Sequence, residues 1–360
     1  MKRVTLRFRV ARPFFALQEK IYLNAIMTSI KKVLIASPRG FCAGVARAVK
    51  AVEDTLQIFG APVYVKHEIV HNKHVVRDIE GKGAITIEKL SEAPDGAIVV
   101  FSAHGSPPEH YTEARSRGMR LIDATCPLVT KVHLEVLRFL KEGYEIIYIG
   151  HKGHIEGVGV RGEAGEKEIP IIETIADVEA LEIGQPEKLI YLTQTTLSID
   201  DTKNVITALK RKYPQIIAPP IEDICYATTN RQEAVKALAQ TAQLVLILGS
   251  RSSSNSTRLM EVAKAKGAIS YLIDDVSHIE ENWLEGIETV GLSAGASAPE
   301  KLVEGVVKFF EKQGAVIEDF IVKAEAMKFA EPLELMKIRA SEPVRDISFV
   351  ARNQNFERKA

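Results

Sequence analysis

Three cysteines, the only ones among 360 residues, stand at equivalent places in three similar stretches of the chain. They are Cys42, Cys126 and Cys225. Each follows a short strand-like run and precedes apolar residues at helical spacing. Pro127, directly after Cys126, suits the first position of a helix, where its missing N–H is not needed. One cysteine in each of three similar units indicates one shared site.

Each unit continues with two further strand-like runs that end in small polar or imidazole residues. The runs are rich in β-branched, aromatic and leucine residues and cover 62–70, 97–101, 144–149, 189–192, 244–248 and 289–292. Strands that alternate with helices at this spacing predict an α/β fold with mainly parallel sheets. Because ligands of such sheets bind beyond the carboxyl ends of the strands, three lobes that face one another would share a common centre.

We predict three α/β domains, 31–125, 126–223 and 224–335, each with one cysteine. Residues 1–30 hold six basic residues and one acidic residue, and we interpret them as an extension without a folded role. An organellar transit peptide in residues 1–26 is the alternative, because such leaders are rich in arginine and poor in acids. The tail, 336–360, has mixed charge and no periodicity, so we expect it to be poorly ordered.

The charge balance argues against nucleic acid as a partner. The chain has 47 basic and 47 acidic residues, which leaves no basic footprint. No apolar run approaches the roughly 18 residues that a membrane span needs. Three cysteines without a close pair argue against a disulfide framework. A reducing compartment, the cytoplasm, is therefore expected, with organellar import as the alternative.

Two short patterns resemble known motifs without the context that those motifs need. His67-Glu-Ile-Val-His71 fits the His-Glu-x-x-His pattern of zinc peptidases, which requires both histidines on one face of a helix. Its flanks are β-forming, so we do not expect that helix. Gly157-Val-Gly-Val-Arg-Gly162 fits G-x-G-x-x-G, but a dinucleotide site needs it directly after a strand and at the start of a helix. We predict a flexible loop there.

The cysteines and the polar loops call for ligands of different kinds. A buried free cysteine is commonly only a small hydrophobic residue, but three thiolates without a C-x-x-C pair fit an iron–sulfur cluster with one open iron better than zinc. Short donors near strand ends and helix N-termini suggest a phosphate or diphosphate. Lys152 and Arg251 either assist or are solvated. Glu156 is the one carboxylate within such a loop.

Longer motifs then identify a family. The motifs are 38–44, 68–72, 102–106, 123–127, 193–198, 224–232, 253–256 and 295–299. They resemble the 4-hydroxy-3-methylbut-2-enyl diphosphate reductase (LytB/IspH) family over roughly residues 31–335. The resemblance implies a trefoil of three α/β domains around one [4Fe-4S] cluster. It also implies an iron–sulfur oxidoreductase for the last step of the methylerythritol phosphate route to isoprenoids, with reduced ferredoxin or flavodoxin as electron donor.

The resemblance also implies roles for individual residues. Cys42, Cys126 and Cys225 would hold the cluster. Glu156 would supply the proton, and Thr195 would position the hydroxyl end of the substrate. The diphosphate would bind to His71, His104, His154, Ser253, Ser254, Asn255 and Ser297.

The chain departs from the family pattern beside Glu156. Ile155 stands where the family commonly has proline, and Gly157-Val-Gly159 replaces a Val-Glu-Gly-like run. A loop that swings away would leave Glu163 or a water to deliver the proton. Two other classes stay open from the residues alone: a zinc hydrolase that uses His67 and His71, and a non-catalytic phosphate-binding protein with inert cysteines.

Overall fold

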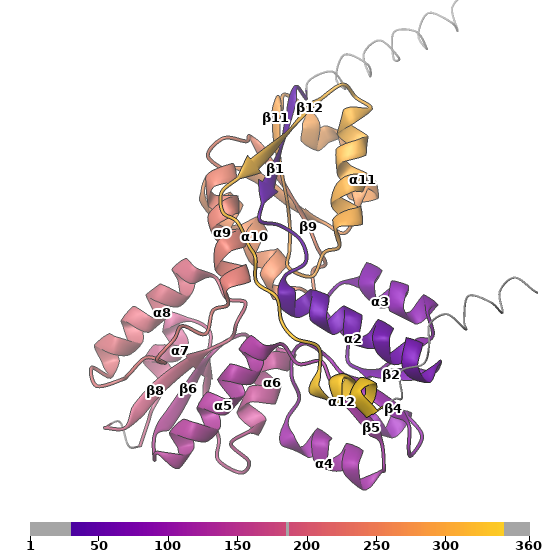
Figure 1. The fold of residues 1–360 in the computed structure, drawn as a ribbon. Coiled ribbons are helices and arrows are strands. Elements are labelled where there is room, and N and C mark those ends of the chain that lie inside the picture. The colour runs from indigo at the N-terminus through magenta and orange to yellow at the C-terminus, as the bar shows by residue number, and fades with distance from the viewer. Residues whose placement is uncertain (1–29, 185–186, 342–360) are drawn as a thin grey trace, which may run out of the picture.

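Three parallel β-sheets, each flanked by helices, form three lobes of the protein in the computed structural model (Figure 1). The structure describes residues 30–184 and 187–341, so the N-terminal extension and the last part of the tail lie outside the described residues. The predicted α/β fold with mainly parallel sheets is confirmed. None of the described helices is long and apolar enough to cross a membrane.

The largest sheet has the strand order β10-β9-β11-β1-β12. Its strands are β1 (Lys32–Ser37), β9 (Leu244–Leu248), β10 (Ile269–Ile273), β11 (Thr289–Ala294) and β12 (Val316–Ile321). The second sheet, β3-β2-β4-β5, contains β2 (Val63–Lys66), β3 (Ala84–Ile87), β4 (Ile98–Phe101) and β5 (Arg120–Asp123). The third, β7-β6-β8, contains β6 (Glu145–Ile149), β7 (Ile171–Ile172) and β8 (Leu189–Thr193).

Eleven α-helices of the described residues cover these sheets. They are α2 (Ala43–Phe59), α3 (Lys73–Gly81), α4 (Pro108–Ser116), α5 (Pro127–Lys141), α6 (Ile155–Gly162), α7 (Ile175–Ala180), α8 (Ile199–Lys212), α9 (Tyr226–Leu238), α10 (Ser254–Ala265), α11 (Glu300–Glu311) and α12 (Leu333–Ser341). Strand β9 reads Leu-Val-Leu-Ile-Leu and is buried along its whole length, as expected of a parallel strand covered on both faces.

Strand β1 belongs to the largest sheet, where it lies between β11 and β12. The chain thus starts in one lobe, crosses to the second and third, and returns to the first. The predicted domain 31–125 therefore contributes to two sheets, and the domain boundaries themselves stay a prediction. This crossing places the loop between β1 and α2, which carries Cys42, at the junction of the lobes.

One local expectation is wrong. Residues 157–162 form most of helix α6 instead of a flexible loop, because His154 caps the helix N-terminus and Val160 is fully buried; tertiary packing overrides the low helix propensity of glycine here. Helix α12 extends to Ser341, within the predicted tail, and its residues Leu335 and Ile338 pack against the core of the second sheet's lobe; the rest of the tail lies outside the described residues.

Candidate functional site

All twelve site residues expected from the sequence line one cavity of about 100 Å³, to which residues of all three lobes contribute. They comprise the three cysteines, three histidines, three serines, Asn255, Glu156 and Thr195. Apolar side chains, including Val70, Ala103, Leu128 and Ala296, complete the wall. The sequence motifs therefore meet in space at the carboxyl ends of the strands, although their residues, from Cys42 to Ser297, lie up to 255 positions apart in the chain.

The three cysteines share one local construction. Each is the N-cap residue of a helix, α2, α5 or α9 respectively. Each also donates its backbone N–H to a carbonyl of a neighbouring segment that lines the cavity: Cys42 to Ala296 at 3.2 Å, Cys126 to Ala103 at 3.0 Å and Cys225 to Thr195 at 3.0 Å. Because a helix N-terminus favours negative charge, this position suits a thiolate.

Hydrogen bonds to sulfur differ among the three units. The Cys42 sulfur accepts from the N–H of Val45 at 3.5 Å, and the Cys225 sulfur accepts from the N–H of Thr228 at 3.4 Å. The Thr228 hydroxyl lies 3.2 Å from the Cys225 sulfur. Cys126 makes no side-chain capping bond to its helix, whose first residue is proline.

The thiols fit a positively charged group that binds sulfur. Burial raises the pKa of Cys126 to about 12 and that of Cys225 to about 11, so thiolates need a compensating cation. Coordination to iron supplies that compensation and removes the proton. The described residues contain no three His, Cys, Asp or Glu side chains gathered for a single metal ion. The three sulfurs come from three lobes and line one shared cavity, so they could hold a group larger than a single metal ion.

Gly44 keeps the space between two sulfurs open. A methyl group at this position would lie 2.6 Å from the Cys126 sulfur and 3.9 Å from the Cys42 sulfur. The smaller distance is well below a normal van der Waals contact. The sequence analysis missed two residues: Gly44, and Thr228, which bonds to the Cys225 sulfur. Both lie in the first helical turn after a capping cysteine, and that position could have indicated them.

Three histidines form a cluster on another wall of the cavity. The rings of His71 and His104 stack with centroids 4.2 Å apart, and His154 lies edge-on to His71 at 5.5 Å. Burial, with His71 as a second cause, lowers the pKa of His154 to about 4 and that of His104 well below its usual value. Both are therefore neutral near pH 7.

Neutral histidines can still bind an anion by donating N–H groups. The His154 Nδ1 atom accepts a hydrogen bond from the N–H of Glu156 at 3.2 Å. Its single proton is therefore on Nε2. An anion in the cavity would favour the protonated forms of His104 and His154 and raise the pKa of both rings.

The hydroxyl and amide groups stand at the start of helix α10. Ser253 caps this helix and accepts from the N–H of Ser256. The Ser297 hydroxyl donates to the carbonyl of His71 at 3.0 Å. Both polar atoms of the Asn255 side chain are buried and have no hydrogen-bond partner within the part of the chain that the structure describes. A buried, unpaired amide at a helix N-terminus is an arrangement that suits an anionic ligand.

Glu156 is a buried carboxyl group held by one partner residue. Its Oε1 atom accepts from the N–H of Thr195 at 2.7 Å, and its Oε2 atom accepts from the Thr195 hydroxyl at 2.8 Å. Burial raises the pKa of Glu156 to about 7, although both bonds from Thr195 act to lower it. The group can therefore hold a proton near neutral pH and also release it, which suits a general acid.

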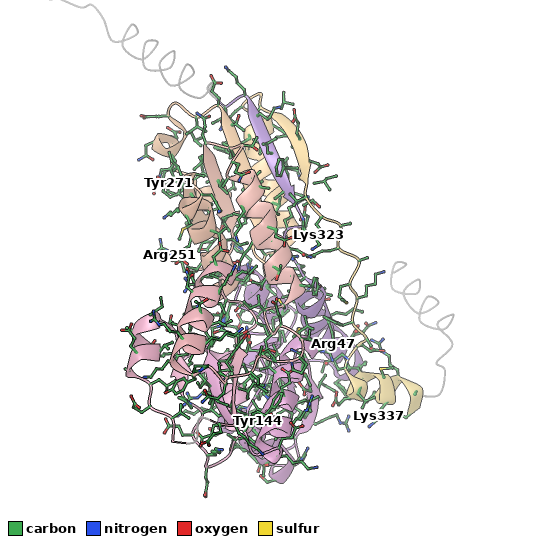
Figure 2. The ribbon with its side chains drawn as sticks, turned by 90° about the vertical axis from the view of Figure 1, so that its left-hand side faces the viewer. Arg47, Tyr144, Arg251, Tyr271, Lys323 and Lys337 are labelled. Atoms are coloured by element: carbon green, nitrogen blue, oxygen red, sulfur yellow. The ribbon has the colours of Figure 1, made fainter. Side chains whose placement is uncertain are left out.

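Three other candidates lie outside the cavity wall. Lys152 is exposed and pairs with Asp177 at 2.6 Å. Arg251 is exposed as well (Figure 2). Glu163 pairs with His133 at 2.7 Å instead of reaching the cavity.

The His-Glu-x-x-His pattern lacks the helix that zinc peptidases need. Residues 67–72 are not helical, and His67 has a left-handed backbone with φ of 61°. Its ring pairs with Glu88 at 2.7 Å.

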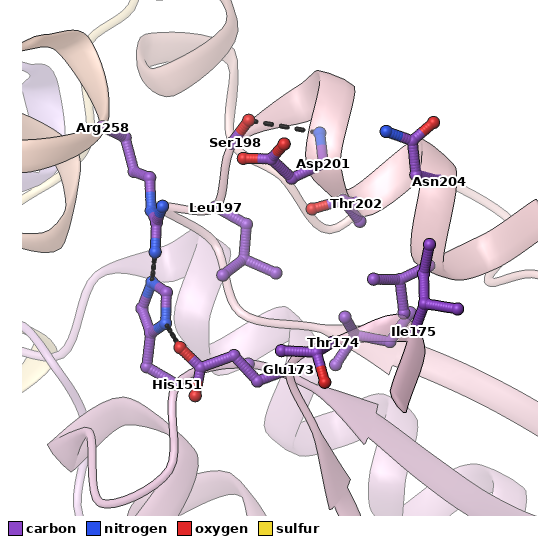
Figure 3. Close-up of a pocket in the computed structure, with 13 residues that line it drawn as sticks. His151, Glu173, Thr174, Ile175, Leu197, Ser198, Asp201, Thr202, Asn204 and Arg258 are labelled. Carbon is purple, nitrogen blue, oxygen red and sulfur yellow. Dashed lines mark hydrogen bonds and ion pairs between the residues drawn. The ribbon is translucent and has the colours of Figure 1, made fainter. Parts of the chain in front are cut away.

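A second pocket lies beyond the end of strand β6, where Gly150 and His151 belong to its wall (Figure 3). It has a volume of about 330 Å³. His151 stands between Glu173, 2.6 Å away, and Arg258 of helix α10, 3.3 Å away. This chain of contacts connects the lobe of Glu156 with the lobe of Asn255, so it helps to fix the two loops relative to each other.

Comparisons with known proteins identify a family. The family model described as "LytB protein" matches residues 33–311. The 4-hydroxy-3-methylbut-2-enyl diphosphate reductases of Streptomyces avermitilis and Bordetella pertussis are 53% and 55% identical, over 86% and 79% of this chain and 92% and 87% of those proteins. The solved structure of the E-1-hydroxy-2-methyl-but-2-enyl-4-diphosphate reductase from Plasmodium falciparum superposes with a TM-score of 0.84 at 38% identity, over 86% of this chain and 98% of that one.

Proposed function

This chain belongs to the LytB protein family, and from that premise we propose that it is a reductase acting on (E)-4-hydroxy-3-methylbut-2-enyl diphosphate. The reaction consumes two electrons and two protons, breaks the allylic carbon–oxygen bond, and releases water. The products are isopentenyl diphosphate and dimethylallyl diphosphate, because the allyl intermediate can take its proton at either end. The observation that carries the proposal is the meeting of three capping cysteines, an anion-type donor set and a buried carboxyl group at one cavity.

Cys42, Cys126 and Cys225 would hold one [4Fe-4S] cluster, each as a thiolate at a helix N-terminus. Such a cluster supplies electrons one at a time and, with three protein ligands, leaves one iron available as a Lewis acid. The raised pKa values of the buried Cys126 and Cys225 thiols support this assignment, since those thiolates need a cation beside them.

The diphosphate would bind to the histidine cluster and to the N-terminus of helix α10. His71, His104 and His154 offer N–H donors, and the unpaired amide of Asn255 offers a further donor. Ser253, Ser254 and Ser297 add hydroxyl groups that line the same wall. Contacts this far from the reacting carbon hold the substrate in place without taking part in bond breaking.

Glu156 would protonate the departing hydroxyl so that water leaves instead of hydroxide. Thr195 would hold the carboxyl group in position through its N–H and its hydroxyl, which lie 2.7 and 2.8 Å from the two Glu156 oxygens. The same hydroxyl faces the cavity and would orient the alcohol end of the substrate. Glu163, paired with His133, is a poorer candidate for the proton source.

Reduced ferredoxin or flavodoxin would supply the electrons, as the family resemblance implies. Zinc hydrolysis and passive phosphate binding remain the competing classes, and one preparation separates all three. Protein purified without oxygen is expected to contain iron and acid-labile sulfide and to form both diphosphate products with a chemical reductant. Zinc in place of iron, or no metal and no turnover after cluster reconstitution, would contradict the proposed function.

A further inference from the structure

Tyr148 carries a buried hydroxyl group that the proposed reaction does not yet use. The residue lies on strand β6 and is fully buried. Its hydroxyl has no hydrogen-bond partner among the residues that the structure describes. An unpaired buried hydroxyl destabilises the folded state, so a group of this kind in a native protein calls for an explanation.

The hydroxyl belongs to the surroundings of Glu156. Burial, followed by the carboxylates of Glu156 and Asp223, holds the pKa of Tyr148 well above its usual value. A side-chain contact between the hydroxyl and Glu156 acts in the same direction, so the two groups are close although the contact lacks the geometry of an ordinary hydrogen bond. The phenol is therefore a permanent O–H donor at any pH at which the protein works. In the described state both Glu156 oxygens accept from Thr195, and each carboxylate oxygen has a second lone pair to offer.

Two glycines make room for the tyrosine ring directly beside Glu156. A methyl group at Gly150 would lie 2.6 Å from the ring carbon Cε1 of Tyr148, and one at Gly157 would lie 3.1 Å from the same atom. Gly157 is also the position at which the chain departs from the Val-Glu-Gly-like run of its family. The large ring on β6 and the missing side chain in α6 thus form one packing unit beneath the turn that carries Glu156.

We propose that Tyr148 is a positioning residue for this reaction: its hydroxyl donates a hydrogen bond to Glu156 once Glu156 has lost its proton, and its ring supports the turn beneath. The proposal rests on the proposed role of Glu156 as proton source. An ionised carboxylate is a stronger acceptor than a carboxylic acid, so the bond strengthens at the moment of proton release. No proton leaves the phenol, and Glu156 is reprotonated before the next turnover.

Other charged groups near Glu156 do not replace this donor. His133 lowers the pKa of Glu156 from a distance, but its Nδ1 is paired with Glu163 and its Nε2 lies against Gly105. Asp223 raises the pKa of Glu156 and is itself bound to Lys131 and to the N–H of Thr193. Cys225 is also near enough to interact with Glu156. Besides Thr195, Tyr148 is thus the neutral donor that the surroundings of Glu156 offer.

The test removes only the oxygen atom. Tyr148→Phe keeps the ring and its packing but loses the bond to the ionised carboxylate, so the titration midpoint of Glu156 is expected to rise by about one pH unit. The midpoint can be read in the cluster-loaded protein without turnover, from the infrared carbonyl band that disappears in Glu156→Gln. In turnover, kcat on the low-pH plateau is expected to fall about three- to tenfold, with KM unchanged.

Tyr191→Phe is the matched control. Tyr191 lies on the adjacent strand β8, opposite Ile147, and packs in the core on the other face of the sheet. The same loss of one oxygen there is expected to leave the Glu156 midpoint unchanged. An unchanged midpoint in Tyr148→Phe, or an equal shift in both variants, would overturn the proposal. Failure of Glu156 as proton source would show separately, as normal turnover of Glu156→Gln.

A double substitution tests the packing part. Gly157→Ala alone is expected to lower the melting temperature, because the added methyl meets the tyrosine ring. In a Tyr148→Leu background the same change is expected to be neutral or stabilising, since alanine is the better helix former. An equal loss in both backgrounds would show that the ring and the glycine are not one unit.

Discussion

The sulfur side and the carboxyl side of the central cavity are built differently, although both use the same repeated unit. Each cysteine caps a helix and gives its backbone N–H to a residue that lines the cavity. In two units that acceptor residue is an alanine, Ala296 or Ala103. In the unit of Cys225 it is Thr195, whose N–H and hydroxyl hold Glu156.

This difference between threonine and alanine explains why, among the described residues, a fold built from three similar units holds a carboxyl group at the central cavity in only one of them. The sulfur side uses what the three units have in common, namely a strand end followed by a helix N-terminus. The carboxyl side uses what one unit has alone: a hydroxyl in place of a methyl group, and a helix, α6, that brings Glu156 to it. The repeat therefore explains the proposed ligands of the cluster and not the proposed proton source.

The largest effect is expected on the sulfur side. Cys42→Ser, Cys126→Ser and Cys225→Ser each remove one of three proposed ligands, and serine is a poor substitute for a thiolate on iron. Each variant is expected to lose most cluster iron and nearly all activity, as measured by iron and sulfide content and by turnover. Full iron content and normal turnover in any one of them would remove that cysteine from the ligand set.

The next effect belongs to the carboxyl side. Glu156→Gln keeps the size of the side chain but cannot donate a carboxylic proton. Cluster content and KM are expected to stay near wild type, while kcat falls by about 10²–10⁴-fold. The measurement uses cluster-loaded protein and a chemical reductant. A kcat within a few-fold of wild type would contradict the role of Glu156.

The pH dependence of kcat/KM is a second test of the role of Glu156. Since burial raises the pKa of Glu156 to about 7, the acid form is lost as the pH rises through 7, and kcat/KM is expected to fall about tenfold per pH unit above it. The raised value also means that the folded state keeps a proton that the unfolded chain has released. The resulting stabilisation is present below the ordinary value of 4.5 and is lost as the pH rises toward 7. Glu156→Gln should show neither effect.

Much of this architecture was predictable from sequence because its parts are local. An apolar run of strand length predicted β9 at its observed bounds, and helical periodicity after the cysteines predicted helices where α5 and α9 begin. The crossing of β1 into the largest sheet was not predictable, because strand partners are set by tertiary packing rather than by the strand's own residues.

The residues that line the cavity were predicted from sequence motifs. The elements that hold them in place, such as helix α6, were not predicted. Cys42 and Asn255 stand in long motifs that mark them directly. Helix α6 was missed because its three glycines gave it no helical signal, and one of them, Gly157, is required by the ring of Tyr148 nine residues earlier. Periodicity cannot reveal such a contact, because it depends on how a strand and a helix pack against each other.

A smaller effect is expected when the third unit is made to match the other two. Thr195→Ala installs the residue found at the equivalent places and removes the hydroxyl bond to Glu156 at 2.8 Å, while the backbone N–H bond stays. We expect kcat to fall about tenfold and the alkaline limb of the pH profile to move upward, because the ionised carboxylate loses a donor. Thr195→Ser, which keeps the hydroxyl, should restore most of the activity. Equal losses in both variants would show that the hydroxyl is not what matters.

The smallest effect tests whether the sulfur side depends on space as well as on ligands. In Gly44→Ala the new methyl would meet the Cys126 sulfur at 2.6 Å, so that sulfur must shift. Alanine is otherwise favoured over glycine within a helix by up to about 1 kcal/mol. The cluster-free protein should therefore fold at least as well as wild type, while the loaded protein should release iron to a chelator a few-fold faster.

Gly305→Ala provides the control, since Gly305 lies within helix α11 and an added methyl there meets nothing within 4 Å. It carries the same gain in helix propensity without touching a sulfur, so its iron release should equal that of wild type. Faster release in both variants would assign the effect to helix stability instead of to the sulfur. Faster iron release in Gly44→Ala alone would mean that the three capping cysteines need an open space between them. No single unit can provide that space, because it is enclosed by residues of all three.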